Sequence, residues 1–561
     1  MPDRQTPPVA VTGPRPISSL DGCVPQFAVH FETFGCRLNQ IESESAARSF
    51  ADCGFAVDME SLTAAAPAPR NTVISVVNTC TVTGKAEQKA RRLIRLLLRK
   101  MPSSCVLVTG CYAQLEVEAI RALDSRVCVL PGSRKDLLAD IPQELSSYLA
   151  VAGWSEDGDG RALTSFVTDL VARLSEQQPA PDNIKRRNPE PGQEEQGTSS
   201  RLAPGKAFAT KDLSGFVPVE PPSPGAPATS PVFRLSTDTF FTHSRSSVKI
   251  QDGCNCQCTY CRIHLARGSS VSLDVASVVE RIQRLEAAGQ QEVVLTGVNL
   301  SQYRGEWNGT HLKLAGLLSQ ILDKTTRIRI RISSLYPESV DEELCSVIAH
   351  RRVQPYFHLS VQSGSDRILR LMRRPYRSIQ VYRAVQLLRQ AKDRPFIACD
   401  IIAGFPGETE EDFELTKRMC QACEFAWIHA FPFSARPGTP AATMKGQVPQ
   451  SVAGERVRWL ASFAIQSKCA YISLWKGKLV SAITERNRHD RRNGDGDSTG
   501  QKQLTHAVTE NFIHVELPGS HPQGAAIWVR IGGPLPDRIR AGDECDAFGE
   551  AVHDEDMEGA P

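Results

Sequence analysis

Hydrophobic and polar positions follow two different periods between residues 27 and 148. Buried strands are predicted by short apolar runs at 27–31, 73–77, 105–110 and 127–132. Helices are predicted by apolar positions every three or four residues at 41–55, 84–100 and 115–123. Strands that alternate with helices form parallel βαβ units, so we expect a Rossmann-like α/β domain over residues 26–150.

A second series of strands and helices begins near residue 247. Its strands are predicted at 247–251, 291–297, 329–335, 356–364, 395–407 and 426–436. Helical periods lie between them, for example at 275–289, 378–391 and 411–419. Six repeats are fewer than the eight of a closed (βα) barrel, so we expect a partial (βα)6 barrel over residues 239–466.

Two further segments lack the alternation of strands and helices. Residues 151–238 contain a short helical stretch near 165–177 and then a tract dominated by proline, serine and glycine, which predicts a low-complexity, largely disordered insertion. Residues 467–553 contain short strand patterns separated by turn residues, which predicts a small all-β barrel. The whole chain of 561 residues is too long for a single core.

Charge and cysteine content narrow the class of protein. The 65 Lys and Arg residues balance 63 Asp and Glu, so any nucleic-acid site must be a local patch. No apolar run approaches the roughly 20 residues of a membrane span, and the N-terminus is proline-rich where a signal peptide would be apolar. We therefore expect a cytoplasmic protein without a membrane partner. In a reducing compartment, clustered cysteines indicate metal binding or catalysis.

Four cysteines crowd into the segment DGCNCQCTYCRIH. Cys254, Cys258 and Cys261 have a C-x3-C-x2-C spacing and directly follow a predicted barrel strand, where barrel active sites are built. Three thiolates on a [4Fe–4S] cube leave one iron open, whereas a structural zinc site requires four closed ligands. The other C-x2-C pair, Cys420–Cys423, is distant and lies in a helical pattern. We interpret Cys256, inside the x3 segment, as a bystander, with a redox role or alternate ligation as the lesser alternative.

Three more cysteines follow predicted strands of the N-terminal domain. They are Cys36, Cys80 and Cys111. The carboxyl ends of parallel strands share one edge of a sheet, so these thiols are expected to meet there. Three convergent thiolates suit a second cluster with a free iron. Spacing alone equally allows three unrelated strand-end cysteines.

Resemblance to a family decides between these alternatives. The phrases TFGCRLNQIESE, VNTCTVTGKAEQKARRLIR, VTGCYAQ, KIQDGCNCQCTYCRI and IIAGFPGETEEDF resemble the radical-SAM methylthiotransferase family, over about residues 29–134 and 245–448. The resemblance implies that Cys36, Cys80 and Cys111 bind an auxiliary [4Fe–4S] cluster. It implies that Cys254, Cys258 and Cys261 bind the radical S-adenosylmethionine (SAM) cluster. The β-rich tail is similar in position to the family's RNA-binding TRAM domain.

The substrate branch is indicated by GCRLNQIESE. Its pair Glu42–Ser43 resembles the branch that modifies N6-threonylcarbamoyladenosine (t6A) beside the anticodon of tRNA, because the other branches usually have an aspartate–serine pair. The resemblance implies methylthio transfer to adenine C2, in which SAM supplies both the methyl group and a radical. The anticodon loop of tRNA is then a partner. An electron donor and a sulfur source are also required, and the sequence identifies neither of them, nor an oligomeric state.

Alternative interpretations follow from the same residues. Within the family, the substrate could be isopentenyladenosine in tRNA or an aspartate of a ribosomal protein. From another class, the chain could be a non-catalytic, zinc-containing RNA-binding protein. A basic helix at 85–100 is either a solvated face or a contact for tRNA phosphates. Asp400 is expected to have a polar role in the barrel mouth, and Arg267 and Arg436 either bind an anionic group or form structural ion pairs.

Overall fold

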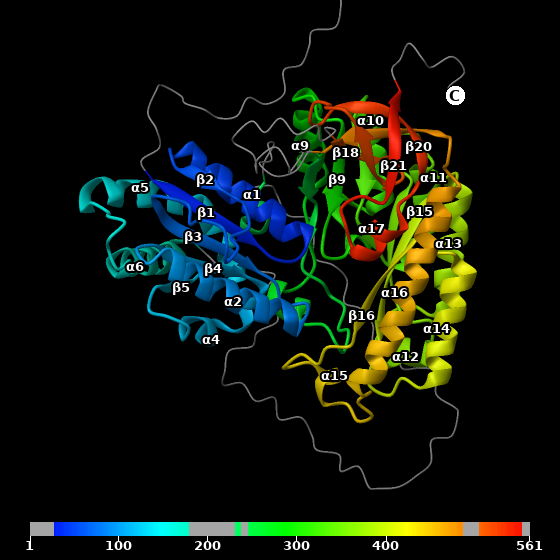
Figure 1. Cartoon of the computed structure of the whole chain (residues 1–561), viewed down its shortest axis with the longest axis horizontal. Coiled ribbons are helices and arrows are strands. Elements are labelled where there is room, and N and C mark those ends of the chain that lie inside the picture. Colours follow the sequence, from blue (N-terminus) through cyan, green and yellow to red (C-terminus); the bar gives the residue numbers. More distant parts are fainter. Residues whose placement is uncertain (1–26, 179–229, 237–244, 486–503, 553–561) are drawn as a thin grey trace, which may run out of the picture.

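The chain forms three bodies, which follow one another along the sequence (Figure 1). The computed structural model describes residues 27–178, 230–236, 245–485 and 504–552. An N-terminal α/β domain lies beside a central partial barrel, and a small β-barrel covers part of that barrel. The fold class predicted from the sequence is confirmed in each of the three.

The N-terminal domain is a five-stranded parallel sheet covered on both faces. Its strand order is β2-β1-β3-β4-β5. The central strand is buried throughout, and its neighbouring residues Val76 and Val77 belong to two separate cores on opposite faces. Helices α1, α5 and α6 cover one face, and α2 and α4 cover the other. The strands are β1 (Ala28–Thr33), β2 (Ala56–Asp58), β3 (Thr72–Thr79), β4 (Cys105–Gly110) and β5 (Val127–Val129). The helices are α1 (Arg37–Asp52), α2 (Gly84–Lys100), α3 (Cys111–Leu115), α4 (Val117–Arg121), η1 (Gly132–Ala139), α5 (Ile141–Ala152) and α6 (Arg161–Gln177).

Helix α6 corrects the predicted start of the insertion at residue 151. Its apolar stripe, Leu163, Val167, Leu170 and Leu174, packs into the same core as strands β1 and β4. Burial of that stripe stabilises the helix on the sheet, so residues up to Gln177 belong with the N-terminal domain. Most of the tract predicted to be disordered, at 179–229 and 237–244, lies outside the described residues.

The central body is an open barrel with six parallel strand positions. Strands β12-β9-β6 form one sheet and β13-β14-β15-β16 another. Only Ser333 separates β12 from β13, so the two sheets meet at one interrupted strand. The strands are β6 (Ser246–Lys249), β9 (Glu292–Thr296), β12 (Arg329–Ile332), β13 (Ser334–Leu335), β14 (Tyr356–Gln362), β15 (Phe396–Ala403) and β16 (Trp427–Pro432).

Helices surround this barrel on the outside. The longer ones are α9 (Val275–Ala287), α10 (Leu314–Lys324), α11 (Glu342–Ile348), α12 (Asp366–Leu371), α13 (Ser378–Ala391), α14 (Glu410–Cys423) and α16 (Gln450–Ser473). The shorter elements are η2 (Pro231–Phe233), β7 (Gln251–Asp252), α8 (Ile263–Arg267), β8 (Val271–Ser272), η3 (Leu300–Gln302), β10 (Gly305–Trp307), β11 (Thr310–Leu312), η4 (Pro337–Ser339) and α15 (Pro440–Thr443).

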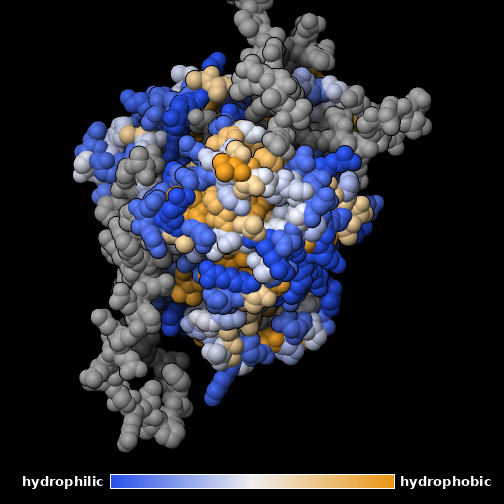
Figure 2. Space-filling model, turned by 90° about the vertical axis from the view of Figure 1, so that its left-hand side faces the viewer, coloured by the Kyte–Doolittle hydropathy of each residue, from blue (hydrophilic) through white to orange (hydrophobic). Residues whose placement is uncertain are grey.

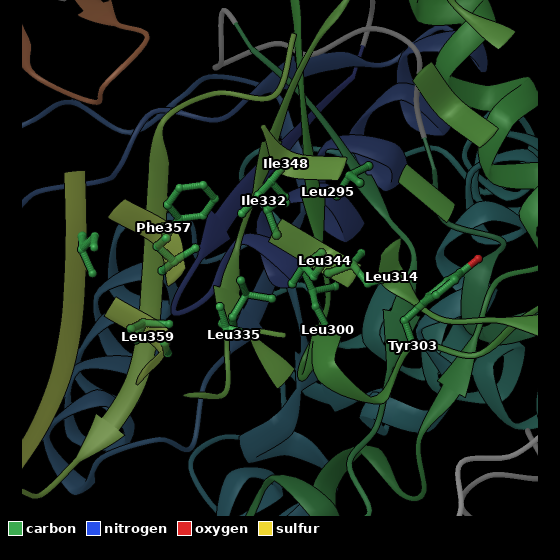
Figure 3. Packing of buried hydrophobic residues seen from close by; sticks show 14 of the residues in the cluster. Leu295, Leu300, Tyr303, Leu314, Ile332, Leu335, Leu344, Ile348, Phe357 and Leu359 are labelled. Atoms are coloured by element: carbon green, nitrogen blue, oxygen red, sulfur yellow. The ribbon is translucent and has the colours of Figure 1, made fainter. Parts of the chain in front are cut away.

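The main core lies between the barrel strands and these outer helices. Leu295 of β9, Ile332 of β12 and Phe357 of β14 belong to one cluster with Leu314 and Leu344 of the helices (Figure 3). These side chains are buried, and their apolar area removed from water holds the barrel together. The strand ends are thereby fixed in place, which positions the loops that carry polar side chains.

The C-terminal body is a closed five-stranded barrel in the order β17-β18-β19-β21-β20. It packs on the central barrel through Phe396 and Tyr471. Helix α16 runs through the predicted boundary at 466/467, and the first strand begins at Leu479. Its elements are β17 (Leu479–Thr484), β18 (Leu504–Thr509), β19 (His514–Pro518), β20 (Ala526–Pro534), α17 (Pro536–Ala541) and β21 (Ala547–Val552).

On the face shown in Figure 2, hydrophilic residues surround a smaller hydrophobic area. Across the described ranges, the helices are all too short or too polar to cross a bilayer.

Candidate active site

Cys36, Cys80 and Cys111 converge at one edge of the N-terminal sheet. Each follows its strand, β1, β3 or β4, within three residues, and these strands are neighbours. All three line one chamber of about 760 Å³. The loops approach so closely that a Cβ on Gly35 would lie 2.6 Å from Cys80 Cβ, and Gly35 has a φ of +96°. Glycine is therefore required before Cys36.

Cys111 and Cys36, when deprotonated, affect the pKa of the neighbouring Cys80. Burial, together with the neighbouring charges of Cys111 and Cys36, raises the pKa of Cys80 to about 12. The Val82 N–H donates to Cys80 Sγ at 3.5 Å and opposes the shift. Thiolates in this setting require a compensating positive charge. Iron and other soft metals supply that charge to thiolates, so the three residues fit a metal cluster.

The barrel cysteines lie in a buried loop after β6 and β7. Cys254, Cys256 and Cys258 pack together, with Cys261 and Tyr260 against them. The loop is pinned because Thr259 donates from its N to the Met372 carbonyl at 3.1 Å and from its Oγ1 to the Leu371 carbonyl at 2.9 Å. These two bonds hold the chain between Cys258 and Cys261 against the end of α12.

Arg374 supplies positive charge to this loop. Its Nη1 donates to Cys258 Sγ at 3.3 Å, and its guanidinium stacks 4.0 Å from the centre of the Tyr336 ring. The pKa of Cys258 is lowered to about 5, first by a hydrogen bond from the Cys256 thiol and then by the charge of Arg374. Stabilisation of a thiolate favours metal ligation, so this set also fits a cluster.

Cys256 has partners of its own. Its Sγ accepts from Gln302 Nε2 at 3.3 Å and lies 3.9 Å from Asn299 Nδ2. It lines a different cavity, of about 270 Å³. These contacts agree with a bystander thiol, and that role stays a prediction.

The spacing of the thiols bears on the kind of metal site. Throughout the described ranges, no three His, Cys, Asp or Glu side chains are grouped closely enough to hold one metal ion. Thiolates around a single zinc ion would be about 3.8 Å apart, given a Zn–S bond of roughly 2.3 Å. A cube of four irons holds its thiolate ligands further apart, because each one binds a different iron.

The chamber lies between the N-terminal domain and the barrel. Val298 packs against the barrel cysteines and also lines the chamber, so it lies between those cysteines and the chamber. The barrel lining includes a polar chain in which Ser334 Oγ lies 2.8 Å from His358 Nδ1 and His358 Nε2 lies 3.2 Å from Asp400 Oδ1. The polar role expected for Asp400 in the barrel mouth is therefore confirmed.

A buried ionic network joins the two domains behind this chamber. Glu42 of α1 accepts from Lys135 Nζ at 2.5 Å, from Lys249 Nζ at 2.9 Å and from Arg267 Nη1 at 3.1 Å. Arg267 also donates to Asp252, two residues before Cys254. The three cations, with Arg267 first, hold the pKa of Glu42 well below its usual range although burial opposes this. Arg267 thus forms structural ion pairs with Glu42 and Asp252.

Asn39 connects this network to the N-terminal cysteines. Its Oδ1 accepts from Arg267 Nη2 at 2.7 Å, and its Nδ2 donates to the carbonyl of Thr79, which precedes Cys80, at 3.1 Å. Asn39 and Glu42 lie three residues apart and hence on one face of α1. The segment NQIE therefore acts as a contact between domains.

A second interdomain contact involves Glu87 of α2. Arg436 binds it and also donates to Thr81 Oγ1 at 3.2 Å, while Arg262 Nη1 lies 3.5 Å from Glu87. Thr81 directly follows Cys80. Arg436 is expected from the sequence either to bind an anionic group or to form a structural ion pair, and the structure shows the ion pair, with Glu87.

Sequence reasoning did not single out Arg374 or the interdomain role of Glu42. The only signal for Arg374 was the arginine pair in RLMRRPY. That signal is weak, since basic residues before a proline at a helix end are also common on protein surfaces. For Glu42, the partners lie 93, 207 and 225 residues away, which no local pattern encodes.

Comparison with known proteins agrees with this arrangement. Residues 248–420 match the Radical SAM superfamily, and residues 28–132 match the Uncharacterized protein family UPF0004. A threonylcarbamoyladenosine tRNA methylthiotransferase MtaB of Treponema pallidum is 48% identical over 90% of this chain and 98% of its own. One from Thermotoga maritima is 31% identical over 82% of this chain and 86% of its own.

More distant similarities exist as well. A tRNA-2-methylthio-N(6)-dimethylallyladenosine synthase of Erythrobacter litoralis is 28% identical over 81% of this chain and 86% of its own. Among solved structures, the radical SAM methyltransferase TsrM of Kitasatospora setae has a TM-score of 0.42 at 15% identity, covering 75% of this chain and 74% of its own. The alternative of a non-catalytic zinc-containing RNA-binding protein is overturned by the first two relatives. The chain belongs to the radical-SAM methylthiotransferase family.

Proposed function

We propose that this protein transfers a methylthio group to C2 of t6A beside the anticodon of tRNA. The observation that carries the proposal is the convergence of Cys36, Cys80 and Cys111 on a chamber shared with the barrel strand ends. A radical-SAM cluster needs one set of three thiols, and this chain has a second set. The relative at 48% identity carries the same activity in its name.

Each thiol set would hold one cofactor. Cys254, Cys258 and Cys261 would bind the radical-SAM [4Fe–4S] cluster, and the N-terminal three would bind the auxiliary one. When bound, the clusters and SAM supply the electron, the radical and the sulfur that an unactivated adenine C–H bond requires. The residues of the chain position these groups: Arg374 balances the charge of Cys258, and the ionic network around Glu42 fixes the two loops relative to each other.

The chamber suits a modified nucleoside. Its volume of about 760 Å³ lies in the range of small-molecule pockets. Burial and the neighbouring His358 lower the pKa of His429 to about 4, so His429 is neutral at pH 7 and both donates and accepts hydrogen bonds. His429, Ser334 and Asp400 can together bind the edges of a base that is turned out of an RNA loop.

Helix α2 offers a surface for tRNA phosphates. Lys89, Arg92, Arg95 and Arg99 are exposed along one side of it and border an open groove. Within the described part of the chain, these four form no ion pair or side-chain hydrogen bond. Unpaired cations on an exposed helix face are what an anionic backbone would bind.

The substrate branch rests on Glu42–Ser43 and on the identities of the relatives. Identity to the dimethylallyladenosine enzyme is 28%, against 48% to a t6A enzyme. Isopentenyladenosine and a ribosomal-protein aspartate are the substrates this proposal sets aside. A cytoplasmic location, an electron donor and a sulfur source as partners stay predictions.

Nucleoside analysis tests the proposal. The chain is expressed in a host that lacks 2-methylthiolated adenosines, and its tRNA is digested and examined by liquid chromatography with mass spectrometry. We expect the t6A signal to gain a species in which one hydrogen is replaced by SCH3, with isopentenyladenosine unchanged. A methylthio product on isopentenyladenosine alone would show that the substrate is wrong, and a host with unchanged tRNA would contradict the activity.

A further inference from the structure

Arg37 is a cation without a counter-ion in the chamber. It is the first residue of α1, directly after Cys36, and it is only partly accessible. Among the described residues, no carboxylate pairs with it and no hydrogen bond fixes its guanidinium. Arg245 and Arg331, from the barrel side, line the same chamber. Arg267 lines it as well and is paired with Glu42 and Asp252, so four guanidinium groups of like charge face one cavity.

The carboxylates around the chamber are already engaged. Glu292 forms a two-pronged contact with Arg331, at 2.7 and 2.9 Å. Glu485 Oε1 accepts from Arg245 Nε at 3.0 Å.

The remaining carboxylate of the lining has a different partner. Asp400 lies 3.2 Å from His358, so it too is already engaged. Arg37 is consequently the excess positive charge. A confined charge without a partner is unfavourable, and an anionic ligand would offset that cost.

A carboxylate has the right shape for this position. A guanidinium donates two parallel hydrogen bonds to a carboxylate, a pairing that gives geometric selectivity as well as affinity. In t6A, the substituent on N6 ends in the carboxylate of threonine, whereas the substituent of isopentenyladenosine is an uncharged hydrocarbon. The two candidate bases thus differ in the group that an unpaired arginine recognises.

We infer that Arg37 binds the threonine carboxylate of the substrate base and so makes the chamber selective for an acidic N6 substituent. This inference rests on the proposed function. It assigns to Arg37 a role in substrate specificity, separate from the clusters and from the RNA backbone. Such a site rejects an analogue that lacks the carboxylate, because the arginine is then left without a partner.

The test uses the full-length protein with both clusters and two stem–loop RNAs of one sequence. One RNA carries t6A and the other carries its methyl ester, which removes the negative charge and adds one methyl group. We expect wild-type kcat/KM to be about tenfold or more higher on the acid. Arg37→Gln should lower kcat/KM on the acid by about the same factor and leave the ester nearly unchanged, and Arg37→Lys should recover part of the loss.

Binding gives an independent readout. Fluorescence anisotropy of the two labelled RNAs, measured without SAM so that its own carboxylate is absent, should show the same loss of discrimination in Arg37→Gln. Arg458→Gln is the matched control, because Arg458 is exposed on α16 with 73% of its side chain accessible. It should bind both RNAs as the wild type does. Iron content per chain checks that each variant holds its clusters.

Several outcomes overturn the inference. Equal losses on both RNAs would assign Arg37 to the phosphate backbone, and equal losses with an altered paramagnetic resonance spectrum would assign it to the auxiliary cluster. A wild type that converts acid and ester equally would also overturn it while the proposed function stands. A wild type that methylthiolates neither RNA would remove the proposed function itself.

Discussion

Lys249 Nζ lies 2.9 Å from Glu42 Oε1, and this contact joins strand β6 of the barrel to helix α1 of the N-terminal domain. Both side chains are buried, at 4% and 3% exposure. Glu42 also binds Lys135 and Arg267, so one carboxylate compensates cations from three segments. Since Asn39 and Asp252 connect this network to the loops of Cys80 and Cys254, it sets the distance between the two thiol sets.

Neutralising Glu42 should therefore loosen the interdomain contact. In Glu42→Gln, Lys249 and Arg267 would keep their contacts with Asp252, whereas Lys135 would lose its carboxylate partner. The loss of one partner from a buried ionic group costs about 3–5 kcal/mol. We expect a lower thermal unfolding midpoint at a fixed scan rate and faster limited proteolysis. The unfolding midpoint of Glu42→Asp should lie between those of the wild type and Glu42→Gln, because the shorter side chain keeps the charge but cannot reach Lys135 and Lys249 together.

The control for Glu42 is an exposed glutamate. Glu455 has 67% of its side chain accessible and lies 4.0 Å from Arg458, so Glu455→Gln should change stability by about 0.5 kcal/mol or less. If Glu42→Gln unfolds at the same temperature as Glu455→Gln, the network is not a structural link.

Iron analysis should separate the two thiol sets. Anaerobically prepared wild type should hold about eight irons, as two cubes of four. Alanine substitution of Cys254, Cys258 and Cys261 should leave about four, and substitution of Cys36, Cys80 and Cys111 should also leave about four. Cys256→Ala is the matched control and should keep all of them. A fall to zero in either triple variant, or a loss in Cys256→Ala, would contradict the assignment.

The convergence of the N-terminal cysteines could be predicted from sequence because it depends on one rule. Parallel strands present their carboxyl ends at one edge, and Cys36, Cys80 and Cys111 each follow such a strand. Their family resemblance then indicated a shared ligand. The barrel and the β-rich tail were predictable for the same reason, since their strand periods are local.

Other features depend on contacts that a local pattern does not contain. Helix α6 carries a clear apolar stripe, but its proximity to the proline-rich tract led to its assignment to the insertion. The interruption at Ser333 and the pairing of Arg436 with Glu87 depend on residues far apart in the chain. That Arg37 lacks a carboxylate partner can be recognised only from the structure, which shows that the carboxylates on the barrel side bind other residues.

Arg374 should tune the radical-SAM cluster. A positive charge and a hydrogen bond to a ligand sulfur favour the reduced cluster, which carries more negative charge. We expect Arg374→Gln to shift the reduction potential negative by on the order of 50 mV, equivalent to roughly 1 kcal/mol for one electron. Arg374→Lys should retain most of the wild-type potential. Electron paramagnetic resonance during a redox titration measures the reduction potential of each variant. An unchanged potential in Arg374→Gln would show that the contact with Cys258 is only structural.

His30 should give the N-terminal domain a pH-dependent stability. Burial opposes its charge, but hydrogen bonds to Asp58 at 2.7 Å and Glu32 at 3.4 Å outweigh it and raise the pKa of His30 from 6.5 to about 9. The protonated ring then contributes stability that is full below pH 6.5 and is lost as the pH rises through 9. The contribution of this shift is about 3–4 kcal/mol at most.

The measurement for His30 compares wild type with His30→Gln. The difference in unfolding midpoint should be largest near pH 6 and should shrink toward pH 9.5, in protein of equal iron content. A difference that grows with pH would mean that the folded protein holds His30 neutral.

The exposed face of α2 should bind tRNA through charge alone. Replacing a cation that contacts phosphate weakens binding to all RNA sequences alike and lowers the salt slope by about one per contact. We therefore expect Arg92→Gln/Arg95→Gln to reduce the slope of log Kd against log salt by about two, with t6A and unmodified stem–loops affected equally. Arg458→Gln should leave the slope unchanged. If the double variant kept the wild-type slope, these cations would be a solvated face and the RNA backbone would have to follow another surface of the protein.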